Sequence, residues 1–379
     1  MIWYAGLSVI IALIYVNQIR FLVRGWKSIQ CWIEPPDYKP TAFVTVLVCA
    51  RNEENAIQDC LQSLQNQSYP QHLFEIILMD NHSTDSTIAL AKELGIPQLR
   101  IEDLSKVLDE AQTLKKEVIS YGLNLAKGEW ILITDADCIA PTDWISSSIS
   151  FAERSGKKVV AGPVEIIPST TFLGKYQQID MAGLMIATGG GLHTGSLLSA
   201  NGANLLYHRD TLKELPAVID SSRFASGDDI FLIQAIHQKD PEIVSFLKSR
   251  EAIITTKALS SWYEFFSQRR RWASKSNHLP HRGTRWINRV VLANACLICA
   301  HLIMAIFANK WYAALLAVHL MIKALADEQL LKQGKYFFEI EHDWKQQIFN
   351  TIINPLYITL AGLSILVNPG YHWKGRNVR

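Results

Sequence analysis

Two aspartates, Asp135 and Asp137, directly follow a short apolar run at residues 130–134. At the end of an extended strand, residues two apart point to the same side. Two carboxylates on one side suit a cation that prefers oxygen ligands, such as Mg²⁺ or Mn²⁺, and this cation can in turn hold a diphosphate. Two aspartates at this spacing are common by chance, but their position after the apolar run makes them a candidate metal site.

Two earlier apolar runs, at residues 43–49 and 75–79, also end in loops rich in polar residues. The residues that follow are Ala50, Arg51, Asn52 and Glu53 after the first run, and Asp80 after the second. Each loop alone indicates little, because Asn and Asp are common in turns and at helix N-termini. Three loops of this kind at strand ends nevertheless predict one ligand-binding pocket.

Another pair of acids, Asp228 and Asp229, stands at the start of a predicted helix that runs to His237. Two interpretations fit this position. Acidic residues are favoured at a helix N-terminus, where they cap the helix and interact with its dipole. Alternatively, one carboxylate is a general base that removes a proton from a reacting group.

A basic stretch begins at residues 268–272, which read QRRRW, and extends to residue 289 with seven Lys or Arg and no acid. Part of this charge is expected beside a membrane span on the cytosolic side. Trp262, Phe265, Phe266 and Trp272 recur at helical spacing, so we expect the segment to lie along the membrane surface. Its guanidinium groups could also clamp a departing diphosphate.

The elements that must position these residues alternate along the middle of the chain. The three apolar runs already named predict buried strands. Helical periodicity predicts helices between and after them, at residues 54–66, 86–94 and 115–126. This alternation predicts an α/β domain with a mostly parallel sheet. Ligands of such sheets bind beyond the carboxyl ends of the strands, which is where the candidate residues lie.

Both ends of the chain are apolar enough to lie in a membrane. Residues 2–16 carry no charge and, continued to residue 23, would form about 33 Å of helix. Arg20, Arg24 and Lys27 follow without a small-residue cleavage site, so we expect an uncleaved anchor with the residues after 24 in the cytosol.

The C-terminal third contains further candidate spans at residues 290–307, 311–326 and 348–367, of which the first two form a predicted hairpin. An anchor, a hairpin and a last span would place the basic tail outside. Either one run is therefore interfacial or re-entrant, or the positive-inside rule fails here.

Composition excludes several classes of protein. The 379 residues include 37 Lys and Arg against 35 Asp and Glu, and this net charge of +2 does not fit a nucleic-acid-binding protein. The sequence has no P-loop, dinucleotide fingerprint or HExxH motif. The six cysteines form no extracellular framework, and Cys296 and Cys299 lie in an apolar span, so reduced thiols are expected.

These patterns predict five segments in chain order. They are a transmembrane anchor at residues 1–24, a cytosolic α/β domain at 40–260, a basic amphipathic interface segment at 261–289, transmembrane helices at 290–367 and a basic tail at 368–379.

The motifs, taken in order from about Thr45 to Trp272, resemble the family 2 glycosyltransferases with the GT-A fold. The resemblance is greatest to the membrane-bound branch that includes cellulose, hyaluronan and chitin-oligosaccharide synthases. VLVCARNEE and ILMDNHSTD are similar to the nucleotide-contacting loops of the family, and KGEWILITDADC to its D-x-D. ANGANLLYHRD is similar to its acceptor-side segment, SGDDIFL to its catalytic-base motif and QRRRW to its Q-x-x-R-W. Asn81, His82 and Asp228 depart from the common residues without removing a required charge.

The resemblance implies an inverting transfer of sugar from a nucleotide-diphosphate sugar. The implied nucleotide-sugar-binding residues are Ala50, Arg51, Asn52, Glu53, Asp80, Lys115, Asp135, Gln268, Arg271 and Trp272. Asp137, together with Asp135, would bind Mg²⁺ or Mn²⁺, and Asp229 would be the catalytic base. Membrane anchoring explains Trp272 equally well. Residues 189–191, His193 and residues 201–204 are expected to line the acceptor side of the pocket.

The flanking helices imply an acceptor held at or moved through the bilayer, either a lipid-linked sugar or a growing polysaccharide. Q-x-x-R-W favours chain synthesis, whereas the small number of spans leaves single additions to a lipid acceptor open. The implied setting is an inner or plasma membrane with a cytosolic catalytic domain, in cell-envelope glycan synthesis beside other envelope glycan enzymes. The alternative is a non-catalytic, nucleotide-sugar-binding membrane subunit of a glycan assembly complex.

Overall fold

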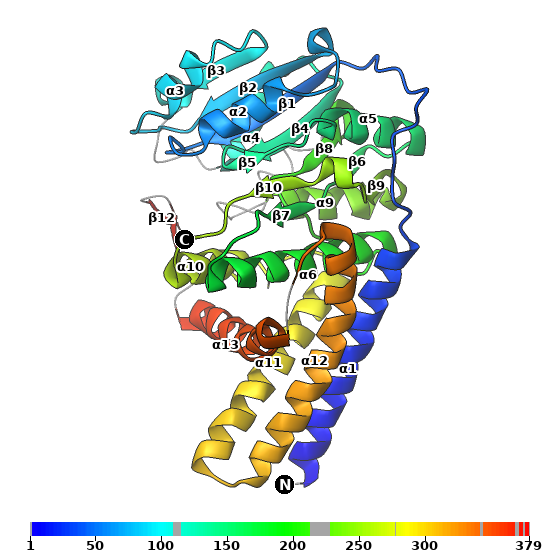
Figure 1. Ribbon diagram of the computed structural model, residues 1–379, viewed down its shortest axis with the longest axis vertical. Coiled ribbons are helices and arrows are strands. Elements are labelled where there is room, and N and C mark those ends of the chain that lie inside the picture. The colour runs from blue at the N-terminus through cyan, green and yellow to red at the C-terminus, as the bar shows by residue number, and fades with distance from the viewer. Residues whose placement is uncertain are drawn as a thin grey trace.

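The computed structural model describes residues 2–108, 115–212, 228–276, 278–341, 344–367, 371–373 and 376–378. Figure 1 shows a domain built on a β-sheet above a bundle of long helices, with further helices lying crosswise between the two. The N-terminus lies at the end of the bundle farthest from the sheet, whereas the C-terminus lies close to the crosswise helices.

The main sheet has seven strands in the order β3-β2-β1-β4-β8-β6-β9. Their bounds are Val44–Ala50 (β1), Phe74–Asp80 (β2), Leu99–Asp103 (β3), Trp130–Asp135 (β4), Val159–Ala161 (β6), Leu205–His208 (β8) and Val244–Phe246 (β9). All neighbours are parallel except β8, which is antiparallel to both β4 and β6. The predicted α/β domain with a mostly parallel sheet is therefore confirmed, and the three predicted strands are β1, β2 and β4.

Helices and a second, smaller sheet complete this domain. The helices are α2 (Ile57–Gln65), α3 (Thr87–Glu93), α4 (Lys115–Leu125), α5 (Trp144–Ser155), α7 (Arg209–Leu212) and α9 (Asp228–Lys239). Ile57, Leu61 and Leu64 of α2 are fully buried, which confirms the face predicted from their spacing. The small sheet joins β5 (Cys138–Ile139), β10 (Ile254–Thr256) and β7 (Val164–Ile166) in that order. It fixes the chain directly after Asp137.

Three long helices form the bundle in Figure 1: α1 (Ile2–Ser28), α11 (Arg282–Phe307) and α12 (Trp311–Phe338). α11 and α12 are joined through residues 308–310 and pack together, which confirms the predicted hairpin. Within the described residues, α1, α11 and α13 (Trp344–Val367) are long and apolar enough to cross a membrane. α12 is equally long, but its second half carries Lys323, Asp327 and Glu328.

One crosswise helix, α6 (Phe172–Thr194), was not predicted as a helix. It packs along the domain-side end of α1 with almost no gap between the backbones. A Cβ atom on Gly190 would lie 2.0 Å from the backbone oxygen of Leu22, and one on Gly25 would lie 2.4 Å from the oxygen of Gly190. Gly189 and Gly190 therefore serve the contact between helices, whereas Gly191 faces Leu197, and none of the three is on the wall of the large cavity described below.

Substituting Gly190 by alanine is expected to separate α6 from α1, because backbone atoms at this contact cannot yield as flexible side chains do. The free energy of unfolding should fall by about 1–3 kcal/mol, the usual cost of overpacking. Gly183→Ala on the same helix is the matched control, because a Cβ there meets nothing within 4 Å and alanine favours the helix. Thermal unfolding of both variants in detergent tests this contact, and equal midpoints would contradict it.

The last long helix, α13, lies across the bundle rather than along it, at the end nearest the sheet (Figure 1). It packs against α11 and against α10 (Trp262–Ala273), another crosswise helix. The hairpin of β11 (Tyr371–Trp373) and β12 (Arg376–Val378) follows, and β11 packs beside α10. The C-terminal hairpin and the domain-side end of α1 thus lie at the same end of the bundle. This arrangement favours the interfacial alternative for the last apolar run.

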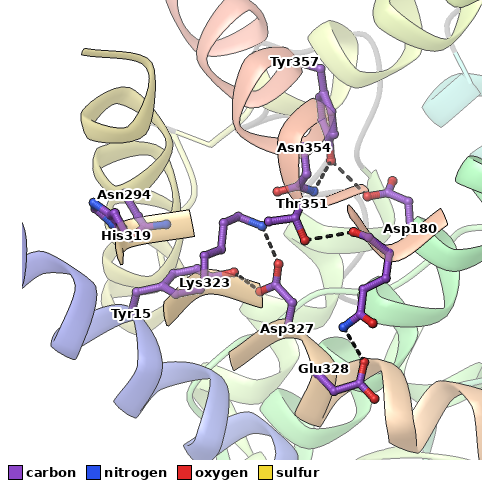
Figure 2. Close-up of polar contacts among 11 residues, drawn as sticks. Tyr15, Asp180, Asn294, His319, Lys323, Asp327, Glu328, Thr351, Asn354 and Tyr357 are labelled. Atoms are coloured by element: carbon purple, nitrogen blue, oxygen red, sulfur yellow. Dashed lines mark hydrogen bonds and ion pairs between the residues drawn. The ribbon is translucent and has the colours of Figure 1, made fainter. Parts of the chain in front are cut away.

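Buried polar contacts join the long helices to one another (Figure 2). The Tyr15 hydroxyl of α1 donates to Asp327 of α12 at 2.5 Å, and Lys323 pairs with the same carboxylate. His319 of α12 meets the Asn294 side chain of α11 at 2.9 Å. Intramembrane polar groups of this kind are stable when they are paired, so these contacts specify which helices are neighbours.

Candidate active site

The candidate loops meet at one edge of the main sheet because the strands before them are in register. Ala50 of β1 is the partner of Asp80 of β2, and Cys49 of β1 is the partner of Asp135 of β4. The chain leaves β1 towards β2 and β3 and then returns to β4 on the other side of β1. Ligands of doubly wound sheets bind at such a reversal of strand order. The predicted convergence of these loops is confirmed.

The loop after β1 is fixed in place by hydrogen bonds to the loop after β2. The Asn52 amide donates to Ser83 Oγ at 2.9 Å, and the Thr84 amide donates back to Asn52 Oδ1 at 2.8 Å. Asn52 has a φ of 53°, in the left-handed region that asparagine tolerates better than most residues. The Glu53 amide donates to Thr87 Oγ1 at 2.8 Å. These contacts fix the backbone that faces the cavity.

Asp80 and Arg51 lie deeper than the rest of the site. Asp80 is fully buried, and its Oδ2 accepts from the Ser83 amide at 3.0 Å. Its Oδ1 is also buried and has no hydrogen-bond partner among the described residues. Burial raises the pKa of the Asp80 carboxyl above its ordinary value, opposed by the hydrogen bonds from Ser83. Arg51 Nη1 donates to the Asn81 carbonyl at 2.9 Å, and Arg51 reaches the cavity wall.

Asp135 and Asp137 are both on the cavity wall, one at the end of β4 and the other just beyond it. The second residue is held by the small sheet, because Thr256 Oγ1 donates to the Asp137 carbonyl at 3.3 Å. Burial raises the pKa of the Cys138 thiol beneath them, and the charges of Asp137 and Asp135 raise it further. Both carboxylates therefore act on the same small volume.

The residues present fit a divalent cation held together with a substrate. Among the described residues no group of three or more His, Cys, Asp or Glu is placed to hold a metal alone. Mg²⁺ and related cations are commonly bound by one or two carboxylates, with substrate phosphates and water completing the shell. Asp135 and Asp137 supply those two carboxylates at a cavity wall.

Asp229 lies in the first turn of α9, half-buried, and faces the same cavity. Its Oδ1 accepts from the Ile230 amide at 2.9 Å. The position satisfies both sequence interpretations, since a first-turn carboxylate is favoured by the helix dipole and this one is also open to a ligand. The Asp228 side chain lies outside the described part of the chain.

α10 places the QRRRW residues on the opposite wall from the sheet. Gln268, Arg271 and Trp272 line the cavity. Arg269 is buried and pairs with Asp180 of α6, with 2.6 Å between Nη2 and Oδ2. The Arg269 guanidinium also lies 4.2 Å from the centroid of the Trp272 ring. One face of that ring is thus covered by Arg269, and a ligand can use the opposite face.

One cavity of about 1050 Å³ contains these groups. The predicted residues on its wall are Ala50, Arg51, Asn52, Glu53, Asp135, Asp137, Asp229, Gln268, Arg271 and Trp272. Asp80 lies behind the wall. Lys115 is the first residue of α4, and its side chain lies outside the described part, although Val118 and Ile119 of the same helix line the cavity.

The predicted acceptor-side residues divide into two groups. Residues 201–203 line the cavity, whereas Asn204 is buried behind it. Asn204 donates to the Pro163 and Ala252 carbonyls, both at 2.8 Å, and accepts from Trp144 at 3.0 Å. Sequence reasoning gave no individual role to Lys275, which is buried on the cavity wall, or to Arg285 and Arg289. Their signal was the basic stretch as a whole, which was assigned in part to the membrane flank and in part to a departing diphosphate.

The strand order, the D-x-D at the end of β4 and the acid at the start of α9 are arranged as in a GT-A fold. Residues 45–215 match the model of the family "Glycosyl transferase family 2". This match covers a little under half of the chain, and the helices long enough to cross a membrane lie outside it.

The curated relatives match over part of their length. Glycosyltransferase AglE of Haloferax volcanii is 27% identical over 123 residues, 32% of this chain and 40% of the relative. Poly-beta-1,6-N-acetyl-D-glucosamine synthase of Staphylococcus epidermidis is 25% identical over 182 residues, 47% of this chain and 42% of the relative. The chain thus spans less than half of either protein.

A solved structure is similar over nearly the whole chain. Mannosyltransferase PcManGT from Pyrobaculum calidifontis, in complex with GDP-Man and Mn²⁺, has a TM-score of 0.60 at 17% identity. The match covers 96% of this chain and 99% of that protein. At this identity the likeness establishes the fold.

Proposed function

We propose that this protein is a membrane-bound, metal-dependent glycosyltransferase that moves a sugar from a nucleotide-diphosphate sugar to a lipid-linked or polymeric acceptor and inverts the anomeric configuration. The observation that carries the proposal is the single cavity that Asp135, Asp137, Asp229 and Arg271 share. It brings together, from three parts of the chain, the groups that transfer from a diphosphate leaving group requires.

Each group has a role that follows from its position. Asp135 and Asp137 would hold the divalent cation, which supplies neutralisation of the diphosphate charge when it is bound. The loop at residues 50–53, with Asp80 behind it, would bind the nucleoside, and Lys115 would assist. Gln268 and Arg271 would contact the diphosphate, and Trp272 would offer its uncovered ring face to the sugar.

Asp229 would act as the general base. It accepts the proton of an acceptor hydroxyl while the hydroxyl oxygen forms a bond to the anomeric carbon. The bond from that carbon to the diphosphate breaks in the same step, and nucleoside diphosphate leaves. A single displacement inverts the configuration at the anomeric carbon without a covalent enzyme intermediate.

The biological setting of the proposal is cell-envelope glycan synthesis in an inner or plasma membrane, with the α/β domain in the cytosol, where sugar nucleotides are found. The basic residues at the domain-side end of α1 support this orientation. The Q-x-x-R-W motif and the helices on both sides of the domain support kinship with the cellulose, hyaluronan and chitin-oligosaccharide synthase branch. Other envelope glycan enzymes are the protein partners that this role implies.

A donor screen tests the proposal. The full chain in nanodiscs would be offered a panel of nucleotide sugars with Mg²⁺, with Mn²⁺ or with excess chelator, together with membrane lipid extract, while nucleoside diphosphate release is followed. We expect release from one donor, at least about 100-fold slower after chelation, because the leaving diphosphate would then lack charge stabilisation.

Asp137→Asn should release nucleoside diphosphate as slowly with metal present as the wild-type protein does in excess chelator. Asp59→Asn is a suitable control, because Asp59 lies on the exposed side of α2 and pairs with Lys257. Release that continues at full rate in chelator would remove the metal from the proposal. No release with any donor would contradict catalysis itself.

A further inference from the structure

The cavity continues beyond the catalytic groups and changes character along its length. Its sheet-side wall carries acids, among them Asp135, Asp137 and Asp229. Its opposite end is formed by aliphatic side chains of the long helices. These are Ile19 and Leu22 of α1, Leu184 and Met185 of α6, Leu292 of α11, and Ile358 and Ile365 of α13.

The wall on each helix is one continuous face. On α13 the lining residues are Ile358, Ala361, Gly362 and Ile365, which recur at helical spacing. On α11 the corresponding face presents Arg285, then Arg289, then Leu292 as the helix leaves the domain. Along one helix face, therefore, the wall changes from cationic to apolar.

The apolar end lies at the depth of the membrane. Trp286 near the start of α11 and Trp344 at the start of α13 are exposed. Trp3 and Trp311 are also exposed, at the starts of α1 and α12, and Figure 1 shows these two helix ends far from the sheet. Tryptophan is enriched at the two interfaces of a bilayer, so these residues mark its boundaries. Leu292 lies six residues beyond Trp286 on α11, or about 9 Å deeper into the bilayer.

Cationic side chains lie between the acidic wall and the apolar end of the cavity. Lys275, Arg285 and Arg289 line the cavity after the QRRRW residues, and Lys275 is buried. Arg285 Nη1 donates to the Pro280 carbonyl at 2.8 Å, which orients its guanidinium group. A polysaccharide would find few hydrogen-bond partners on the aliphatic part of this wall. A lipid with a hydrocarbon chain and an anionic headgroup fits this order, because its chain would lie at the apolar end of the cavity and its headgroup against the cations, next to the acidic wall.

We infer that the acceptor is a sugar-bearing lipid phosphate. Its hydrocarbon chain lies between α1, α6, α11 and α13, its phosphate lies against Lys275, Arg285 and Arg289, and its sugar hydroxyl reaches Asp229. This inference rests on the proposed function for the transfer itself, but binding of the lipid can be measured without turnover.

The test uses a simple probe, dodecyl phosphate with a diazirine at the end of its chain, and the full-length protein in phosphatidylcholine nanodiscs. After irradiation, peptide mass spectrometry locates the adducts. We expect adducts on the lining faces of α11 and α13. Unlabelled dodecyl phosphate should compete for labelling, whereas inorganic phosphate and dodecanol at the same concentration should compete at least about 10-fold less well.

Ile358→Trp fills the apolar end and should lower labelling about 10-fold. Leu360→Trp is the matched control, because Leu360 lies on the exposed side of the same helix. Arg289→Gln should weaken competition by dodecyl phosphate about 10-fold, and Arg282→Gln, exposed on α11 and absent from the wall, should leave it unchanged. Adducts confined to exposed residues such as Leu360, or labelling insensitive to Ile358→Trp, would overturn the inference.

The inference and the proposed function fail in distinguishable ways. Specific labelling without release from any donor would support the lipid site and contradict the transferase. Donor release with transfer to a water-soluble oligosaccharide, and no specific labelling, would overturn the lipid acceptor and leave the transferase intact. Equal competition by dodecanol and dodecyl phosphate would overturn the role of the three cations.

Discussion

Asp229→Asn should lower the rate of sugar transfer by about 10²–10⁴-fold, the usual contribution of a general base. The amide keeps the shape and the polar contacts of the side chain, including acceptance of the Ile230 amide hydrogen. It cannot take the proton of the acceptor hydroxyl. The loss should appear in kcat at saturating donor, because the residues proposed to bind the donor, in the loops after β1, β2 and β4, are untouched.

Two further measurements separate catalysis from folding. The dissociation constant of nucleoside diphosphate and the thermal midpoint should stay near their wild-type values. Asp240→Asn, directly after the C-terminal end of α9, should retain full activity, since Asn can accept the Glu242 amide hydrogen as Asp240 does. If Asp229→Asn keeps more than about a tenth of the transfer rate, Asp229 is only a favourable first-turn residue of α9.

Breaking the buried pair of Asp180 and Arg269 should have the largest effect on stability. Both side chains are less than a tenth exposed, at 8% and 6% respectively, and Tyr357 of α13 donates to the other oxygen of Asp180 at 3.1 Å (Figure 2). Asp180→Ala leaves the Arg269 charge buried without its carboxylate. Removing one partner of a buried pair costs about 3–5 kcal/mol.

The same pair positions the residues around it. Arg269 lies between Gln268 and the Trp272 ring, so its displacement should disturb α10 where that helix lines the cavity. We expect Asp180→Ala to raise the KM for donor as well as to lower the thermal midpoint. The double variant Asp180→Leu with Arg269→Met should recover much of the stability, because an apolar pair of similar volume can replace a buried ion pair. Its KM should stay high, since Arg269 no longer holds Trp272.

An exposed ion pair provides the control. Asp37 and Arg154 are joined at 3.3 Å, but their side chains are 75% and 52% exposed. Asp37→Ala should therefore cost no more than about 1 kcal/mol. A similar small loss for Asp180→Ala would show that the buried pair is dispensable, and an unchanged KM in the double variant would remove its positioning role.

The strands and loops of the site could be predicted because local sequence determines them. In any parallel sheet, a buried β-branched run followed by two acids such as Asp135 and Asp137 predicts a strand with carboxylates at its end. The register of β1 with β2 and β4 places the loops after these strands at the same edge of the sheet, as expected. The ends of these strands differ from the predictions by at most one residue, since a strand end depends on its neighbours as well as on its own residues.

Long-range contacts could not be predicted in this way. α6 is apolar on nearly every side because it is covered by α1, by α12 and by the domain, so it lacks the amphipathic pattern of a surface helix. Asp180 and Arg269 are 89 residues apart, and nothing local distinguishes Arg269 from Arg270 and Arg271. Only packing against α6 makes it the buried member of the three.

The contacts of α1 have a consequence for how the chain is made. Ser8 and Tyr15 find their partners in His301 and Asp327, 293 and 312 residues later. The α/β domain is therefore synthesised between the two parts of one bundle, and the polar groups of α1 have no partners from α11 and α12 until these helices are made. The ionic residues of α12 disfavour its insertion into the bilayer as a single helix, so we expect α12 to insert together with α11. Its Asp327 can then accept a hydrogen bond from the Tyr15 hydroxyl of α1, which is already in the bilayer. α1 is thus fully paired only after α11 and α12 have been synthesised.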